Sequence, residues 1–122
     1  MNAKQLKEEL LNGALDKYSD LYTDTAAEAR RIAEAIDRFA ERFGGDRDIY
    51  VLSVPGRSEI SGNHTDHNRG AVLAGAIDRD IIAVAAKNSD GVIRFLSEGY
   101  EEDRVELALT DSPDNFKNYS SA

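Results

Sequence analysis

The stretch from Pro55 to Gly70, with the sequence PGRSEISGNHTDHNRG, concentrates the side chains of this chain that could do chemistry. It holds three glycines, both histidines of the chain, two arginines, one aspartate and two asparagines. Glycines allow a ligand to approach the backbone, and the polar side chains supply hydrogen-bond donors and acceptors in many directions. This combination indicates a binding site rather than part of a hydrophobic core.

Three neighbouring side chains in this stretch could recognise a polar ligand through hydrogen bonds. Asp66 can accept from two donors, His64 can donate or accept, and Asn63 can do both. A buried group left unpaired by the wrong ligand costs about 1–3 kcal/mol, which is enough to discriminate between closely related ligands.

The charged and imidazole side chains of the stretch also have simpler interpretations. Taken alone, Arg57 would more often form a surface ion pair, and Asp66 would more often stabilise a turn. His64 and His67 lack the third ligand that a metal site needs, so we predict no metal site. The joint placement of these residues favours a binding site.

That placement resembles the signature of the galactokinases, a family of the GHMP kinase superfamily, which has the form GRVNLIGEHTDYNGG. The residues in register with the signature are Gly56, Arg57, Ile60, Gly62, His64, Thr65, Asp66, Asn68 and Gly70. The family continues with a short apolar segment, which is matched here by Val72, Leu73, Ala76 and Ile77. The resemblance spans residues 48–97.

The resemblance implies an activity and a role for each matched residue. Galactokinases transfer the γ-phosphoryl group of ATP, with Mg²⁺, to the anomeric hydroxyl of D-galactose. The implied sugar contacts are Asn63, His64, Thr65 and Asp66. Arg57 takes the position of the arginine beside the anomeric hydroxyl, where its fixed positive charge suits phosphoryl transfer. Ser97 corresponds to a serine that borders the nucleotide in some relatives.

Departures from the signature leave the substrate open. Asn63 stands where the family has a glutamate, and His67 stands where it has a tyrosine. A related kinase for N-acetylgalactosamine, arabinose or galacturonate is therefore an alternative to a galactokinase. A second alternative is a non-catalytic sugar sensor that has kept the sugar contacts and acts through a partner.

The chain lacks two parts of the machinery that the resemblance implies. In galactokinases a phosphate loop rich in glycine and serine and a catalytic aspartate both follow the sugar signature. Neither has a counterpart in the 122 residues, since the glycines after Gly70 are isolated. We expect an N-terminal fragment that is inactive alone, because ATP and Mg²⁺ would bind mostly to the missing C-terminal part of the same kinase. The sugar would lie between the two parts.

Composition narrows the partners and the compartment. The net charge of −8 argues against nucleic acid and against an anionic membrane surface, since both attract clustered lysine and arginine. No segment has the apolar length of a membrane span or of a signal peptide. The absence of cysteine excludes a disulfide framework, and it fits the reducing cytoplasm in which we expect the protein.

The first third of the sequence predicts helices. A first amphipathic helix is expected from Ala3 to about Tyr18. Thr25 and Glu28 have the spacing of a capping box for a second helix, which should end at Gly44 and Gly45. Its apolar residues recur at helical spacing, and the stripe expected in the core is Ile32, Ile36, Phe39 and Phe43.

The rest of the sequence predicts strands. One strand, residues 49–54, leads into the signature. Residues 81–86 and 92–97 should form a hairpin around the turn at 88–91. Val105, Leu107 and Leu109 alternate with charged or small residues and predict one more strand.

The order of these elements predicts a single α+β domain over residues 1–122. Residues 1–45 are expected to be helical, 48–110 strand-rich and 111–122 a loose tail. The sheet should be mixed or antiparallel with the helices on one side. The resemblance implies the same arrangement, that of the second domain of ribosomal protein S5.

Overall fold

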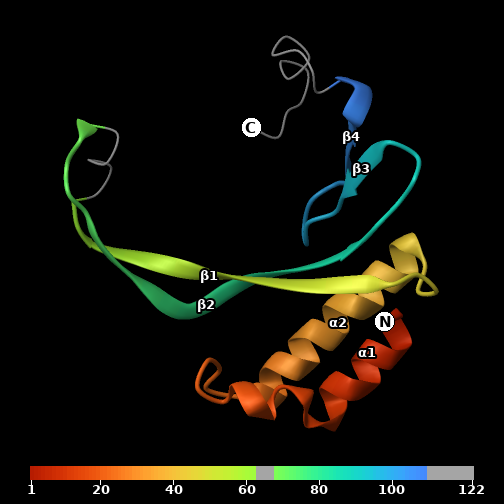
Figure 1. Cartoon of the computed structure of the whole chain (residues 1–122), viewed down its shortest axis with the longest axis horizontal. Coiled ribbons are helices and arrows are strands. Elements are labelled where there is room, and N and C mark those ends of the chain that lie inside the picture. The colour runs from red at the N-terminus through yellow and green to blue at the C-terminus, as the bar shows by residue number, and fades with distance from the viewer. Residues whose placement is uncertain (63–67, 110–122) are drawn as a thin grey trace. The chain divides into compact units, whose positions relative to one another are not determined.

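The computed structural model of the chain describes residues 1–62 and 68–109 (Figure 1). The chain consists of two compact units, Met1–Ala86 and Lys87–Ala122. The first unit combines two helical segments with a long hairpin, and the second is built on a short pair of strands. This composition confirms the α+β class, whereas the likeness to the ribosomal domain stays a prediction.

The first helical segment is shorter than predicted. Helix α1 (Ala3–Glu9) begins with a capping box between Asn2 and Gln5. It continues as a π-helical turn, η1 (Leu10–Ala14), and after Leu15 as a 3₁₀ turn, η2 (Asp16–Tyr18). The α-helix does not reach Tyr18 because Gly13 takes a φ of 88°, outside the helical region.

Helix α2 (Thr25–Phe43) matches its predicted extent but not its predicted cap. The side chain of Asp24 accepts a hydrogen bond from the backbone N–H of Ala27, so Asp24 is the capping residue. The predicted capping box was wrong because Glu28 contacts Arg31 instead, at 2.7 Å. Gly44 ends the helix with a φ of 86°, as predicted.

Strands β1 (Ile49–Ser61) and β2 (Leu73–Ala86) pair antiparallel and form the long hairpin of Figure 1. Alternate residues of the paired ends face the helices, and Val51, Ile82 and Val84 pack against the core. Ile36 lies at its centre with 1% of its surface exposed. The buried residues of this unit are Ala3, Leu10, Ala29, Ile32, Ala33, Ile36 and Ile49.

The predicted core stripe of the second helix is confirmed at its first two residues. Ile32 and Ile36 are buried, and Phe39 packs against the core while half-buried. The ring of Phe43 lies 5.3 Å from the ring of Phe39 but outside the buried cluster.

The hairpin is irregular where it leaves the helices. Pro55 pairs with Asp80 and Arg57 pairs with Ala76, so Gly56 alone opposes residues 77–79. Such a bulge bends a strand and increases its twist. A second, smaller irregularity lies between Glu59 and Ser61.

The second unit corrects the predicted hairpin. Strand β3 (Val92–Phe95) pairs with β4 (Asp103–Glu106), whereas β2 pairs with β1. The expected pairing of residues 81–86 with 92–97 was wrong because 81–86 already pair with 49–54. Ser97 therefore lies beyond the end of β3, and the predicted last strand stops at Glu106 before a 3₁₀ turn, η4 (Leu107–Leu109).

Candidate functional site

The described residues of the signature, 56–62 and 68–70, lie in the outer part of the β1/β2 hairpin, beyond the bulge. We call residues 56–62 and 68–79 the signature arm. Along the arm, the described residues 68–79 of the second half are all exposed, so the helices do not cover them. The arm projects away from the helical layer in Figure 1.

Arg57 lies on β1 just past the bulge, opposite Ala76. Its side chain is 72% exposed, and its Nη2 lies 3.0 Å from Oε1 of Glu59. An arginine has five N–H donors, so one carboxylate oxygen does not exhaust its capacity. The predicted catalytic arginine is therefore an exposed cation on an exposed strand, where it can reach a ligand.

The remaining predicted sugar contacts lie outside the described residues. These are Asn63, His64, Thr65 and Asp66, which follow directly after Gly62. The structure thus places Arg57 on the strand that leads to them, and the roles of all five residues stay predictions.

The backbone at Gly62 favours a glycine. Its φ is 89°, and a Cβ atom would lie 2.4 Å from the carbonyl oxygen of Ala71. Both the backbone conformation and the close approach of the returning strand exclude a larger residue. Gly56 is also crowded, since a Cβ would lie 3.1 Å from the carbonyl oxygen of Arg79.

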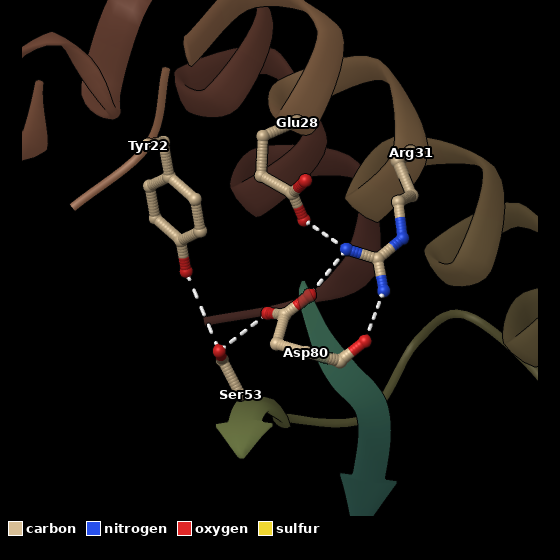
Figure 2. Close-up of polar contacts among 5 residues, drawn as sticks. All are labelled: Tyr22, Glu28, Arg31, Ser53 and Asp80. Carbon is tan, nitrogen blue, oxygen red and sulfur yellow. Dashed lines mark hydrogen bonds and ion pairs between the residues drawn. The ribbon is translucent and has the colours of Figure 1, made fainter. Parts of the chain in front are cut away.

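A polar network at the base of the arm was not predicted from the sequence (Figure 2). Arg31 of α2 donates from Nη1 to the carboxylates of Glu28 and Asp80, and from Nη2 to the backbone oxygen of Asp80 at 2.9 Å. The hydroxyl of Ser53, on β1, donates to the second carboxylate oxygen of Asp80, Oδ2, at 2.5 Å. The hydroxyl of Tyr22 donates to the hydroxyl oxygen of Ser53 at 3.4 Å. The network joins α2, both strands and the loop before α2.

One signal in the sequence could have revealed this network. Ile82, Val84 and Ala86 face the core on alternate positions of β2, and Asp80 continues the same alternation. A carboxylate on the inward face of a strand requires a partner. Which cation supplies it depends on the packing of α2, because Arg31 is distant from Asp80 in the sequence.

The network shifts the ionisation of both its main members. Burial opposes the charge of Asp80, but the hydrogen bonds from Ser53 and Arg31 and the charge of Arg31 outweigh it, so the pKa of Asp80 is lowered. The hydrogen bond to Asp80 raises the pKa of Arg31 above its ordinary value. Asp80 is therefore a carboxylate and Arg31 a guanidinium at neutral pH.

The surroundings of Ser97 give its predicted contact with a nucleotide little support. Ser97 lines a cavity of about 190 Å³ together with Phe95, Tyr100, Glu101 and Asp103. Cofactor sites usually have a volume of roughly 300 Å³ or more. The two carboxylates would also repel a triphosphate. The assignment of Ser97 stays a prediction that this cavity does not strengthen.

Within 1–62 and 68–109, no group of three or more histidine or acidic side chains could hold a metal ion. Among the helices of those same ranges, none is long and apolar enough to cross a membrane.

The comparisons with known proteins agree with the signature. Residues 37–87 match the family model described as the galactokinase galactose-binding signature. The galactokinase of Streptomyces coelicolor is 33% identical over 86 residues, which are 70% of this chain and 22% of that protein. The human galactokinase is 40% identical over 76 residues, 61% of this chain and 19% of that protein.

The Streptococcus suis galactokinase is 38% identical over 87 residues, 67% of this chain and 22% of that protein. The chain thus spans about a fifth of the length of these curated relatives. No solved structure matches the chain significantly. From the family model and these relatives together, the chain carries the galactose-binding signature region of the galactokinases and is similar to them over 61–70% of its length.

Proposed function

We propose that this chain is the galactose-binding portion of a galactokinase, which forms galactose 1-phosphate from D-galactose and ATP. The observation that carries the proposal is the match of residues 37–87 to the galactose-binding signature. The geometry of the arm is compatible with it, since Arg57 is exposed on the strand that leads to the other signature residues.

In this proposal the residues of the arm divide into two roles. Asn63, His64, Thr65 and Asp66 bind the hydroxyls of the sugar and select its stereochemistry. Arg57 places its positive charge beside the anomeric oxygen, where negative charge develops during phosphoryl transfer. ATP supplies the phosphoryl group and Mg²⁺ neutralises its charge, and both bind mostly through the rest of the kinase.

The chain alone should therefore be inactive as a kinase. It contains no glycine-rich phosphate loop after the signature, and its sugar contacts form only one wall of the site. Addition of ATP and galactose to the isolated 122-residue chain should release no ADP above the rate without sugar. Turnover by this chain would contradict the proposal.

A second candidate function is phosphorylation of a related sugar. Asn63 replaces the glutamate of the family signature, which removes a charge and adds two donors. Such a change alters which hydroxyl or substituent the site can accept. N-acetylgalactosamine, arabinose and galacturonate are the substrates to compare with galactose.

The experiment that tests both candidates is phosphorylation of these four sugars by the full-length kinase that contains this chain. The matched variants are Arg57→Ala, Arg57→Lys and Asp66→Ala, with Arg30→Ala as the control at an exposed position of α2. We expect Asp66→Ala and Arg57→Ala to lower kcat/KM for galactose by at least about 100-fold, with partial activity in Arg57→Lys. Arg30→Ala should keep the rate of the unmodified kinase.

Each outcome of this experiment selects one function. Activity confined to another sugar would identify Asn63 as a specificity residue and replace the galactose assignment. Binding of galactose without phosphorylation of any sugar would instead favour the non-catalytic sensor.

A further inference from the structure

We propose that a set of side chains at the bulge, which we call the bulge clamp, positions the signature arm for sugar binding. The clamp consists of Tyr22, Thr23, Arg31, Ser53, Asp78 and Asp80. Its members are positioning residues and contact no sugar. The effect of the clamp on sugar binding rests on the function proposed above, whereas its effect on the orientation of the arm does not.

The bulge is the place where the direction of the arm is decided. Three residues of β2, 77–79, oppose Gly56 alone, so the regular ladder is interrupted between the base of the hairpin and the arm. A bulge of this kind changes the bend and twist of the strands that leave it. Contacts that hold the bulge therefore set the orientation of Arg57 and of the residues that follow it.

The clamp holds the last regular residue pair before the bulge through two residues, Arg31 and Ser53. Asp80 belongs to that pair, opposite Pro55. Its carboxylate accepts from Arg31 on α2 and from Ser53 on β1, and its backbone oxygen accepts from Arg31 at 2.9 Å (Figure 2). Asp80 is thereby attached to the helix and to the partner strand.

A second attachment lies inside the bulge. The hydroxyl of Thr23 donates to Oδ2 of Asp78 at 2.7 Å. The preceding residue, Tyr22, donates to Ser53 at 3.4 Å. One loop, just before α2, thus contacts β1 before the bulge and β2 within it.

Burial separates the contacts of Asp80 from ordinary surface ion pairs. The side chain of Asp80 is only 10% exposed and that of Glu28 14%, while Arg31 is 42% exposed. Exposed pairs contribute little to stability, but a largely buried carboxylate with several donors is held in one geometry. The contacts of Asp80 can therefore hold the strands at the bulge in one orientation, in addition to the attraction between the charges.

Little else in the described residues can fix the orientation of the arm. The core includes the base of the hairpin, through Val51, Ile82 and Val84, but no residue of the arm. All of residues 68–79 are exposed. Because the arm is not packed against the core, the hydrogen bonds at the bulge determine its orientation.

The first test measures the arm directly. The chain has no cysteine, so spin labels can be attached to Glu41→Cys on α2 and Ser58→Cys on the arm, both exposed positions. We expect a narrow distribution of distances between the labels, and a broader or shifted one after Asp80→Ala or Asp78→Ala. Asp78→Asn keeps an acceptor for Thr23 and should restore the narrow distribution.

The matched control removes an ion pair of α2 that is distant from the bulge. Nζ of Lys7 lies 2.6 Å from the carboxylate of Asp37, and Asp37→Ala breaks this pair. The control should leave the distances unchanged. A narrow, unshifted distribution in Asp80→Ala and Asp78→Ala, with the circular dichroism of the unmodified chain, would overturn the proposal.

The second test measures the consequence for the sugar in the full-length kinase that contains this chain. Asp78→Ala and Asp80→Ala should raise the KM for galactose about tenfold, the effect of losing one or two net hydrogen bonds, with the KM for ATP unchanged. Asp78→Asn should restore the KM for galactose, and Asp37→Ala should not alter it. A general loss of folding would instead affect both substrates.

The two proposals fail in different ways. If the unmodified kinase acts on no sugar, the proposed function is wrong, and the label distances still decide whether the clamp orients the arm. If the distances change but the KM for galactose does not, the clamp orients the arm without a role in sugar binding, and that part of the inference is overturned.

Discussion

Two glycines of the hairpin, Gly62 and Gly75, differ in the space available for a side chain. Gly62 has a φ of 89°, and a Cβ atom there would approach the oxygen of Ala71 to 2.4 Å. At Gly75 nothing lies within 4 Å of the same added atom. Substitution by alanine therefore tests the backbone conformation and the close contact at Gly62, and the same substitution at Gly75 is its control.

Gly62→Ala should lower the free energy of unfolding by about 1–3 kcal/mol, because a strained φ and a steric overlap add together. Gly75→Ala should change it by less than about 1 kcal/mol in either direction. Urea denaturation followed by circular dichroism measures both. Equal effects of the two substitutions would show that the conformation at position 62 is not a constraint.

The charge of Asp80 makes part of the stability dependent on pH. The pKa of Asp80 is lowered in the folded chain, so its ionised form stabilises the fold above the pKa of the unfolded chain, near about pH 4. This contribution is lost as the pH falls through the folded-state pKa. Asp80→Asn should therefore be less stable than the unmodified chain at pH 7, and the difference should shrink at about pH 3.

Urea denaturation at several pH values from 3 to 7 measures this difference. Asp20→Asn, at an exposed position before α2, corrects for the loss of one charge from a chain of net charge −8. A difference between Asp80→Asn and the unmodified chain that stays constant over this range would contradict the assigned ionisation.

Single residues could be predicted from the sequence only where a local pattern contains them. Arg57 and Gly62 belong to a short signature whose order is visible in the printed sequence. Arg31 and Asp80 become partners only when α2 packs on β2. The alternation of β2 indicates that Asp80 needs a partner, but no local pattern names it.

Among the elements, helix α2 was the most predictable because local rules determine it. Apolar spacing predicted the buried face with Ile32 and Ile36, and Gly44 predicted the end. Strand pairing joins segments that are distant in the sequence. The prediction that the neighbouring segments 81–86 and 92–97 pair with each other was therefore wrong. Residues 92–95 pair with 103–106 because 81–86 already have 49–54 as partner.

The contact of α2 with the hairpin should depend most strongly on Ile36. Its side chain is 1% exposed in the centre of the core, so Ile36→Ala leaves a cavity and should lower the free energy of unfolding by about 2–5 kcal/mol. Ile81→Ala on β2 is the matched control, since Ile81 is 76% exposed and should cost less than about 1 kcal/mol. Thermal denaturation of both variants measures the difference, and similar costs would show that Ile36 is not central to the core.

On the scale of the whole chain, the two compact units differ in how their structure is held. Within residues 1–62 and 68–108, the buried ones all lie in the first unit, between Ala3 and Ile49, and the residues packed against them extend to Ala86. The second unit is built on the β3/β4 pair, with four residues in each strand. A two-stranded pair alone is marginally stable in water, whereas a hairpin packed on helices can fold independently.

The chain ended at Ala86 should therefore fold without the second unit. It retains every residue of the core cluster, so its thermal midpoint should differ from that of the whole chain by less than about 4 °C, the shift expected for roughly 1 kcal/mol. A chain ended at Arg79 is the control. It loses the core-facing side chains Ile82, Val84 and Ala86, and it should show no cooperative transition by circular dichroism. Loss of the transition in the chain ended at Ala86 would mean that the first unit requires residues 87–122 to fold, and that the two units form one cooperative domain.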